Sequence, residues 1–126
     1  MSAEEQDPLT ERIIGGAIEV HRTLGPGLLE SAYVEVLTVD LVEAGLGFSR
    51  QVPVPLTYKG GYLGEYRLDL LVAEAVVVEV KAVERFDPVH EAQLLTYLRL
   101  TGKRVGLLIN LNRRLLREGI KRLVLG

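Results

Sequence analysis

The spacing of hydrophobic residues predicts helices at the beginning of the chain. Apolar residues repeat every three or four positions, as on one face of a helix, over residues 8–24 and again from a start between Leu28 and Glu30 to Ala44. Asp7 and Pro8 are typical of a helix start, since aspartate caps the free N–H groups and proline fits the first turn. Gly25-Pro26-Gly27 continues neither a helix nor a strand, so we expect a tight turn there.

After residue 47 the pattern becomes typical of strands and then alternates with one further helix. Three strand-like segments follow one another closely enough to form a meander, at residues 48–58, 62–72 and 76–81. Asp87-Pro88 repeats the helix-start signal, and the remaining elements are a helix over residues 88–101 and two short apolar strands at 104–110 and 118–125. The order ααβββαββ predicts an α/β fold, a mixed β-sheet flanked by helices in one domain over residues 1–126, with residues 1–7 as a flexible N terminus.

Composition excludes several classes of protein. The 126 residues include no cysteine, which excludes disulfide frameworks, thiolate zinc sites, iron–sulfur clusters and thiol nucleophiles. The acidic N terminus lacks the features of a signal peptide, and no apolar run approaches the length of a membrane span. We therefore expect a cytoplasmic protein without a membrane partner.

The net charge of -2 hides an uneven distribution. Residues 1–81 carry six basic and thirteen acidic side chains, a net charge of -7, whereas residues 82–126 carry nine basic and four acidic ones, a net charge of +5. A basic last third suits a polyanion such as nucleic acid. A solvated helix face and strand ends would give the same counts, so the charge alone leaves both interpretations open.

Two acidic residues are predicted to meet on the hairpin of the second and third strands. If this hairpin closes symmetrically over residues 73–75, Asp69 faces Glu79, and strand alternation places Lys81 on the same face as Glu79. Opposed like charges are destabilising, so the arrangement favours a divalent cation held by Asp69, Glu79 and the carbonyl of Val80. The alternative is a pair of surface ion pairs, Glu79 with Lys81 and Asp69 with Arg67. The apolar run around Glu79 favours the cation, because a buried charge needs a partner.

Three motifs resemble those of a nuclease family. Asp69 followed by Glu79-Val80-Lys81 matches the signature of the PD-(D/E)xK nucleases, and Gln93-Leu94-Leu95-Thr96-Tyr97 is similar to the Gln-x-x-x-Tyr motif of their RecB-like members. Gly27-x-x-Glu30-x-x-Tyr33 resembles the motif that names the small bacterial GxxExxY proteins. The resemblance extends over nearly the whole chain and implies a restriction-endonuclease-like fold.

The resemblance implies roles for residues outside the hairpin. Glu30 would join Asp69, Glu79 and Lys81 as a catalytic residue and complete the metal site, and His21 would be an additional ligand, preferentially for manganese. For Glu30 the alternative is a favourable charge at a helix N terminus, and for His21 it is a structural role at a helix C terminus. Tyr33 would pack or hydrogen-bond beside Glu30.

The family's third helix implies contacts with nucleic acid. Gln93 and Tyr97 share one helix face and would position the substrate or the catalytic lysine. The alternative is an ordinary amphipathic helix with its tyrosine at the edge of the core. Arg99, Lys103 and Arg104, within the basic last third, would neutralise backbone phosphates.

Together these features predict a nuclease that uses Mg²⁺ or Mn²⁺, cleaves DNA rather than RNA, and leaves a 5′-phosphate. In this hypothesis the carboxylates hold the cation and Lys81 orients the attacking water. One alternative is a non-catalytic module on a nuclease scaffold that binds nucleic acid or protein. Another is a homodimer, or a subunit of a repair or defence complex, with the last strand at the interface.

Overall fold

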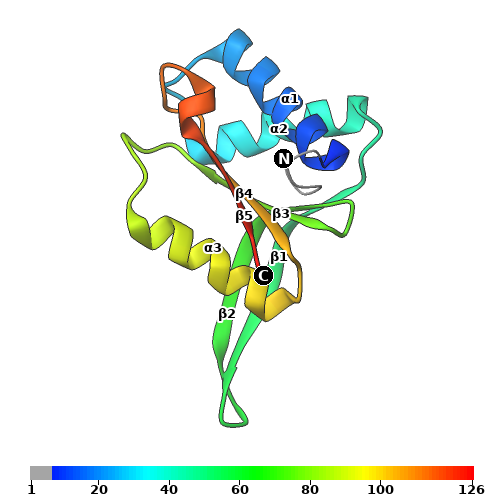
Figure 1. The fold of residues 1–126 in the computed structure, drawn as a ribbon, viewed down its shortest axis with the longest axis vertical. Helices are drawn as coiled ribbons and strands as arrows, with labels where there is room; N and C mark the ends of the chain where they lie inside the picture. Colours follow the sequence, from blue (N-terminus) through cyan, green and yellow to red (C-terminus); the bar gives the residue numbers. More distant parts are fainter. Residues whose placement is uncertain (1–6) are drawn as a thin grey trace.

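A five-stranded sheet with helices on both faces forms the core of the computed structural model, which describes residues 7–126 (Figure 1). The elements are α1 (Pro8–Leu24), α2 (Glu30–Glu43), β1 (Phe48–Tyr58), β2 (Gly61–Val72), β3 (Val76–Lys81), α3 (Pro88–Thr101), β4 (Val105–Asn110), a 3₁₀ turn η2 (Leu116–Gly119) and β5 (Ile120–Val124). The predicted order and the α/β class are confirmed. Within the described range, no helix is long and apolar enough to cross a bilayer. The flexible segment expected over residues 1–7 falls, except for Asp7, outside the described residues.

The sheet is mixed, as predicted, because α3 connects two parallel strands. Its strand order is β1-β2-β3-β4-β5, with β3 and β4 parallel and the other neighbours antiparallel. The β2–β3 hairpin pairs Val72 with Val76 and Leu70 with Val78, which is the predicted symmetric register. The short turn and the alternation of side chains fix this register, because a shift by one residue would turn the valines of β3 to the wrong face.

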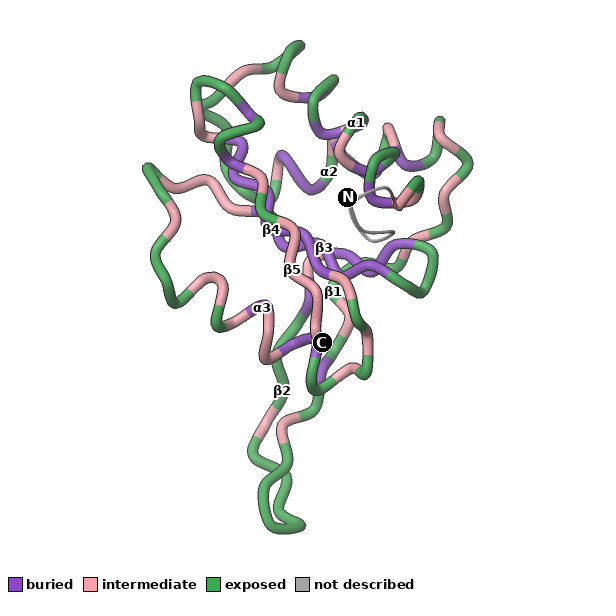
Figure 2. The backbone as a smooth tube through the Cα atoms, viewed as in Figure 1, coloured by how far each residue is buried: buried purple, intermediate pink, exposed green. Residues whose placement is uncertain are grey.

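Each face of the sheet has its own hydrophobic core. Val76, Val78 and Val80 pack with residues of α1 and α2, whereas Val77 packs with α3 residues such as Leu94. β3 is therefore buried on both sides, and Figure 2 shows buried backbone concentrated where β3 and β4 cross the middle of the fold. Glu79 and Lys81 alternate with Val78 and Val80, so they lie on the same face as Val77 and point towards α3.

Tyr33 holds the turn between α1 and α2. Its hydroxyl donates to the carbonyl of Gly25 at 2.6 Å and accepts the N–H of Leu28 at 3.2 Å. Gly27 has φ of 112°, a conformation that favours glycine. Because Leu29 is still extended as the N-cap, α2 begins at Glu30, at the late end of the predicted boundary. The turn thereby sets the position of Glu30.

The last strand is shorter than predicted. The expectation of a strand over residues 118–125 is wrong at its start, where η2 precedes β5. The reason is a close approach of backbones, since a Cβ added to Gly119 would lie 2.3 Å from the carbonyl oxygen of Asn110. The chain therefore turns tightly against the end of β4 before β5 starts.

Candidate active site

Asp69 and Glu79 come together where the β2–β3 ladder stops. Beyond the pair of Leu70 with Val78, hydrogen bonds to side chains take the place of the backbone hydrogen bonds of the ladder. The N–H of Asp69 donates to Glu79 Oε2 at 2.8 Å, and the N–H of Val80 donates to Asp69 Oδ2 at 2.8 Å. Each carboxylate is thus held by the backbone of the other strand, which places the two acidic groups side by side.

The β1–β2 ladder is interrupted at the same point. Arg50 pairs with Leu70 and Val52 pairs with Leu68, but the register skips the intervening Gln51 and Asp69. Gln51 has φ of 49°, a left-handed conformation that costs energy for a residue other than glycine. The sheet therefore opens at Asp69 on both sides.

Burial makes the ionised pair unfavourable. The side chain of Glu79 is only 4% exposed, and this desolvation, with the nearby charge of Asp69, raises the pKa of Glu79 from 4.5 to about 8. Burial also raises the pKa of Asp69, although the N–H of Val80 and the charge of Lys81 oppose the rise. Without a cation, this pair favours holding a proton.

The donor atoms fit a hard divalent cation. Each carboxylate uses one oxygen for a backbone N–H, and no residue between 7 and 126 donates a hydrogen bond to Glu79 Oε1 or Asp69 Oδ1. Magnesium is commonly bound through one or two carboxylates and keeps several waters. In the described part of the chain, no three Asp, Glu or His side chains form a cluster that could hold an ion. The structure thus brings Asp69 and Glu79 together as the two carboxylates of the site, without a third acidic side chain in the same cluster among the described residues.

Glu30 lies at the entrance to this site. It is the exposed first residue of α2, and its charge contributes to the raised pKa values of Asp69 and Glu79. A cleft of about 390 Å³ contains both Glu30 and Asp69 in its lining, with Ser31, Ala32, Val34, Glu35, Arg50 and Gln51. The α1–α2 turn therefore brings Glu30 to the open side of the carboxylate pair.

Lys81 and the α3 motif meet on the same face of the sheet. Lys81 Nζ donates to Gln93 Oε1 at 3.4 Å, and no ion pair joins Lys81 to Glu79 in residues 7–126. Arg67 pairs with Glu65 at 3.1 Å instead of with Asp69, so the alternative of two surface ion pairs is not formed. Gln93 orients the lysine that the resemblance identifies as catalytic.

Tyr97 lies one helical turn after Gln93 and is buried in the α3 core. Burial, followed by the nearby charge of Glu79, raises the pKa of Tyr97 to about 12. Its phenol therefore remains protonated, and the side chain lies near enough to Glu79 and Asp69 for their charges to contribute to the raised pKa.

His21 lies away from this cleft. Its Nε2 is 2.6 Å from the carbonyl oxygen of Arg113, so the ring connects the end of α1 to the loop after β4. His21 lines a different hollow, with Ile18 and Leu116. Tyr33, which was expected beside Glu30, holds the turn that precedes it. A metal-binding role for His21 stays a prediction.

Arg99, Lys103 and Arg104 lie towards the opposite end of the parallel strands. Arg104 immediately precedes β4, whose first residue, Val105, pairs with Val76, while Lys81 pairs with Asn110. With a rise of about 3.3 Å per residue, these strand ends are roughly 16 Å apart. Arg104 and the preceding Lys103 are therefore not brought to the carboxylates, whereas Arg99 lies on the last turn of α3. Contact of these three residues with phosphates stays a prediction.

Asn110 is a supporting residue that the sequence patterns did not identify. Its buried amide accepts the N–H of Val83 at 3.1 Å and donates to the carbonyl of Val83 at 2.8 Å. The N–H of Leu111 donates to the carbonyl of Lys81 at 3.1 Å, so the end of β4 holds the chain that follows Lys81. The available signal was a polar residue at the end of an apolar strand.

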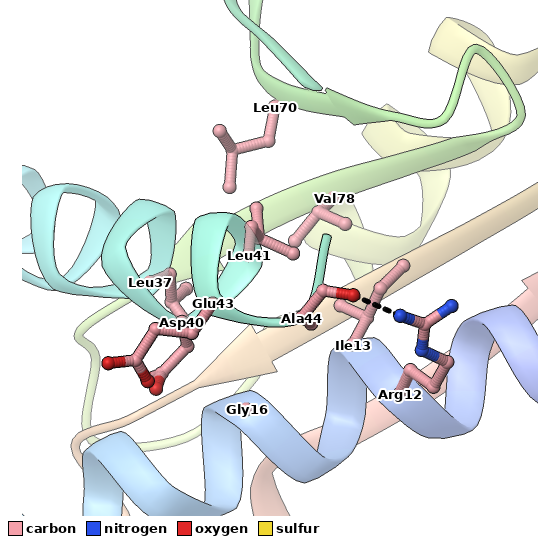
Figure 3. A pocket seen from close by; sticks show the side chains of 10 residues that line it. All are labelled: Arg12, Ile13, Gly16, Leu37, Asp40, Leu41, Glu43, Ala44, Leu70 and Val78. Atoms are coloured by element: carbon pink, nitrogen blue, oxygen red, sulfur yellow. Dashed lines mark hydrogen bonds between the residues drawn. The ribbon is translucent and has the colours of Figure 1, made fainter. Parts of the chain in front are cut away.

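A further hollow, of about 250 Å³, lies between α1 and α2 on the other face of the sheet (Figure 3). Leu70 and Val78, the last ladder pair before the carboxylates, contribute to its lining. Arg12 crosses its edge to the carbonyl of Ala44. None of the site residues predicted from the sequence lines it.

Comparison with known proteins identifies one match. The family model of the PD-(D/E)XK nuclease superfamily matches residues 7–123. No curated protein and no solved structure matches the chain. The matched range contains Glu30, the carboxylate pair, Lys81 and the motif on α3, and the mixed sheet between helices agrees with a restriction-endonuclease-like fold.

Proposed function

Because the chain belongs to the PD-(D/E)XK nuclease superfamily, we propose that it is a nuclease that uses Mg²⁺ or Mn²⁺ to hydrolyse phosphodiester bonds of DNA. The observation that supports this best is the pair of buried Glu79 and half-buried Asp69 at an interrupted sheet, with Lys81 on the same face as Glu79. A purely structural hairpin would gain nothing from these two adjacent acids, since burial raises the pKa of both and the charge of Asp69 raises the pKa of Glu79 further.

The residues that would hold the cation are Asp69 and Glu79, with Glu30 and the carbonyl of Val80 as further ligands. When bound, such a cation would lower the pKa of a coordinated water and offset negative charge on the phosphate. The backbone N–H groups of Asp69 and Val80 fix the two carboxylates before any ligand arrives. This preorganisation avoids the cost of ordering the side chains during the reaction.

Lys81 would orient the attacking water and stabilise the charge that develops on the phosphate. An ammonium has three donors, so the bond to Gln93 leaves two for water and a phosphate oxygen. The product would carry a 5′-phosphate. DNA is the proposed substrate because the motif of Gln93 and Tyr97 resembles that of RecB-like nucleases.

Cleavage assays test this function. The full chain would be incubated with linear and circular DNA, in single- and double-stranded forms, and with RNA, each with Mg²⁺, Mn²⁺ or EDTA. We expect cleavage of DNA only with a cation, and a loss of at least about a hundredfold in Glu79→Gln and Lys81→Met, since these groups act on the reacting atoms. Glu74→Gln, on the exposed turn between β2 and β3, is the matched control and should cleave like the wild type.

Two results would contradict the proposal. Cleavage that persists at the wild-type rate in both site variants would assign the activity to other residues or to a contaminant. A wild-type protein that cleaves none of these substrates would favour the non-catalytic alternative.

A further inference from the structure

A hollow between α3 and β2 lies on the face of the sheet that carries Lys81, and the proposed chemistry does not use it. It has a volume of about 280 Å³ and is lined by Tyr66, Val89, Ala92, Gln93, Thr96 and Tyr97. We call it the tyrosine groove. Its lining contains aromatic, aliphatic and neutral polar side chains and no charged one.

Two tyrosines whose rings pack in a tilted arrangement form one wall of the groove. Tyr66, on β2, is 42% exposed, and its ring centroid lies 5.6 Å from that of Tyr97 at an interplanar angle of 54°. Tyr97 is only 4% exposed and therefore supports the ring of Tyr66 from the interior. Tyr66 thus presents an aromatic surface whose position is held by packing.

The groove adjoins the candidate active site at Gln93. Gln93 lines the groove and also accepts the hydrogen bond from Lys81 Nζ. A ligand in the groove that contacts Gln93 therefore lies next to the residue that binds Lys81. Arg99 follows Thr96 by one helical turn, so an exposed cation flanks the same side of α3.

The exposed aromatic residues of this chain indicate the chemistry of the ligand that the tyrosine groove binds. The chain has five tyrosines, two phenylalanines and no tryptophan. Of the exposed tyrosines on the β1–β2 hairpin, Tyr66 alone lines the groove in the described part of the chain, whereas Tyr58 and Tyr62 flank the turn at the hairpin tip, beyond the end of α3 (Figures 1 and 2). Exposed aromatic rings beside cationic groups are typical of surfaces that stack unpaired bases and contact phosphates.

Resting on the nuclease function proposed above, we propose that the tyrosine groove binds one unpaired base of a single-stranded nucleic acid, next to the phosphodiester that is cleaved. Tyr66 stacks on this base. In a duplex each interior base is already paired and stacked on both sides, so it presents no free face to the ring. The preferred substrate is therefore single-stranded.

Binding measured without cleavage tests the groove directly. Fluorescence anisotropy in EDTA would compare a labelled single strand with the blunt duplex of the same sequence, using the wild type, Tyr66→Phe, Tyr66→Leu and Tyr66→Ala. We expect Tyr66→Ala and Tyr66→Leu to weaken binding of the single strand roughly 5- to 150-fold, the range for one stacked base. Tyr66→Phe should bind like the wild type, because it keeps the ring. A 2-aminopurine base in the strand should be quenched by the wild type and Tyr66→Phe only.

Controls separate stacking from loss of structure. Tyr66→Leu keeps an apolar contact with Tyr97, so its unfolding midpoint should stay close to that of the wild type. Tyr58→Ala, an exposed tyrosine outside the groove, should leave binding unchanged. Equal weakening by Tyr58→Ala, or equal loss for single strand and duplex, would overturn the inference.

The outcomes also distinguish this inference from the nuclease function. If the wild type cleaves DNA but Tyr66→Leu binds single strands normally, the groove proposal fails and the nuclease remains. If the wild type binds single strands through Tyr66 but cleaves nothing with a cation, the groove remains and the nuclease fails. Concentration-dependent dimerisation that Tyr66→Ala abolishes would assign the groove to a second copy of the chain and overturn the proposal.

Discussion

Glu79→Gln should make the cation-free protein more stable at high pH and remove most of its response to a divalent cation. Glutamine has nearly the shape of glutamate, and its amide oxygen can still accept the N–H that Asp69 donates at 2.8 Å. The substitution therefore removes the buried charge while it leaves the packing and this hydrogen bond in place. Few substitutions isolate the electrostatic contribution of one group so cleanly.

The magnitude follows from the pKa of Glu79. This carboxyl titrates near 4.5 when unfolded, whereas burial raises its pKa to about 8 in the fold. Between these values the folded state keeps a proton that the unfolded state has released, so the free energy of unfolding falls as pH rises. At about 1.4 kcal/mol per pH unit, the loss reaches about 5 kcal/mol above pH 8. Below pH 4.5 both states are protonated and the penalty is absent.

Urea unfolding measured from about pH 5 to about pH 9 in EDTA would show this difference. We expect the wild type and Glu79→Gln to have similar stability at the acid end and to diverge as pH rises, with the variant more stable. Some slope should remain in the variant, because Asp69 also has a raised pKa. At a cation concentration one hundred times its dissociation constant, the wild type should gain about 2.7 kcal/mol, and the variant much less.

Two results would refute this reasoning. Parallel stability curves for the wild type and Glu79→Gln across the pH range would show that Glu79 does not carry a buried charge. Equal stabilisation of both proteins by Mg²⁺ or Mn²⁺ would show that the cation binds elsewhere. Glu74→Gln, which changes an exposed carboxylate on the same hairpin, should follow the wild type in both respects.

Two further substitutions test the packing that positions the site, each by urea unfolding. Gly119→Ala should destabilise the protein by about 3 kcal/mol or more, since its Cβ would meet a backbone oxygen at 2.3 Å, whereas Gly47→Ala, with no atom near its Cβ, should change little. Wild-type stability in Gly119→Ala would mean that the end of β4 is not packed so tightly. Tyr33→Phe should cost about 1–2 kcal/mol, because it removes the hydroxyl bonded to Gly25, while exposed Tyr58→Phe should be neutral. A neutral Tyr33→Phe would remove the role of this hydroxyl in holding the α1–α2 turn.

The parts of the fold that follow from local patterns could be predicted from the sequence. The register of Val72 with Val76 follows from a three-residue turn and strict alternation, both of which are properties of one short segment. The helix starts at Pro8 and Pro88 follow from their preceding aspartates, whose side chains accept N–H groups as caps do. The start of β5 could not be predicted, because the turn at Gly119 depends on contact with a distant backbone.

The same distinction applies to the candidate site. Asp69, Glu79 and Lys81 were identified together because one hairpin carries all three. The distance from Glu30 or His21 to this hairpin depends on how α1 and α2 pack, which no spacing in the sequence gives. The left-handed backbone of Gln51 also has no sequence signal, since glutamine rarely adopts it.

Cation binding should release a proton, because the carboxylate pair at the interrupted ladder holds one when no cation is bound. The bonds from the N–H groups of Asp69 and Val80 satisfy the backbone, and a proton on the pair relieves the charge when no cation is present. A cation must displace that proton, so its affinity should rise up to tenfold per pH unit until pH approaches about 8, the pKa of Glu79, and then level off. Calorimetry in buffers of different ionisation enthalpy should therefore detect about one proton released per cation near pH 6.5. An affinity independent of pH below 8 would mean that the cation does not compete with this proton.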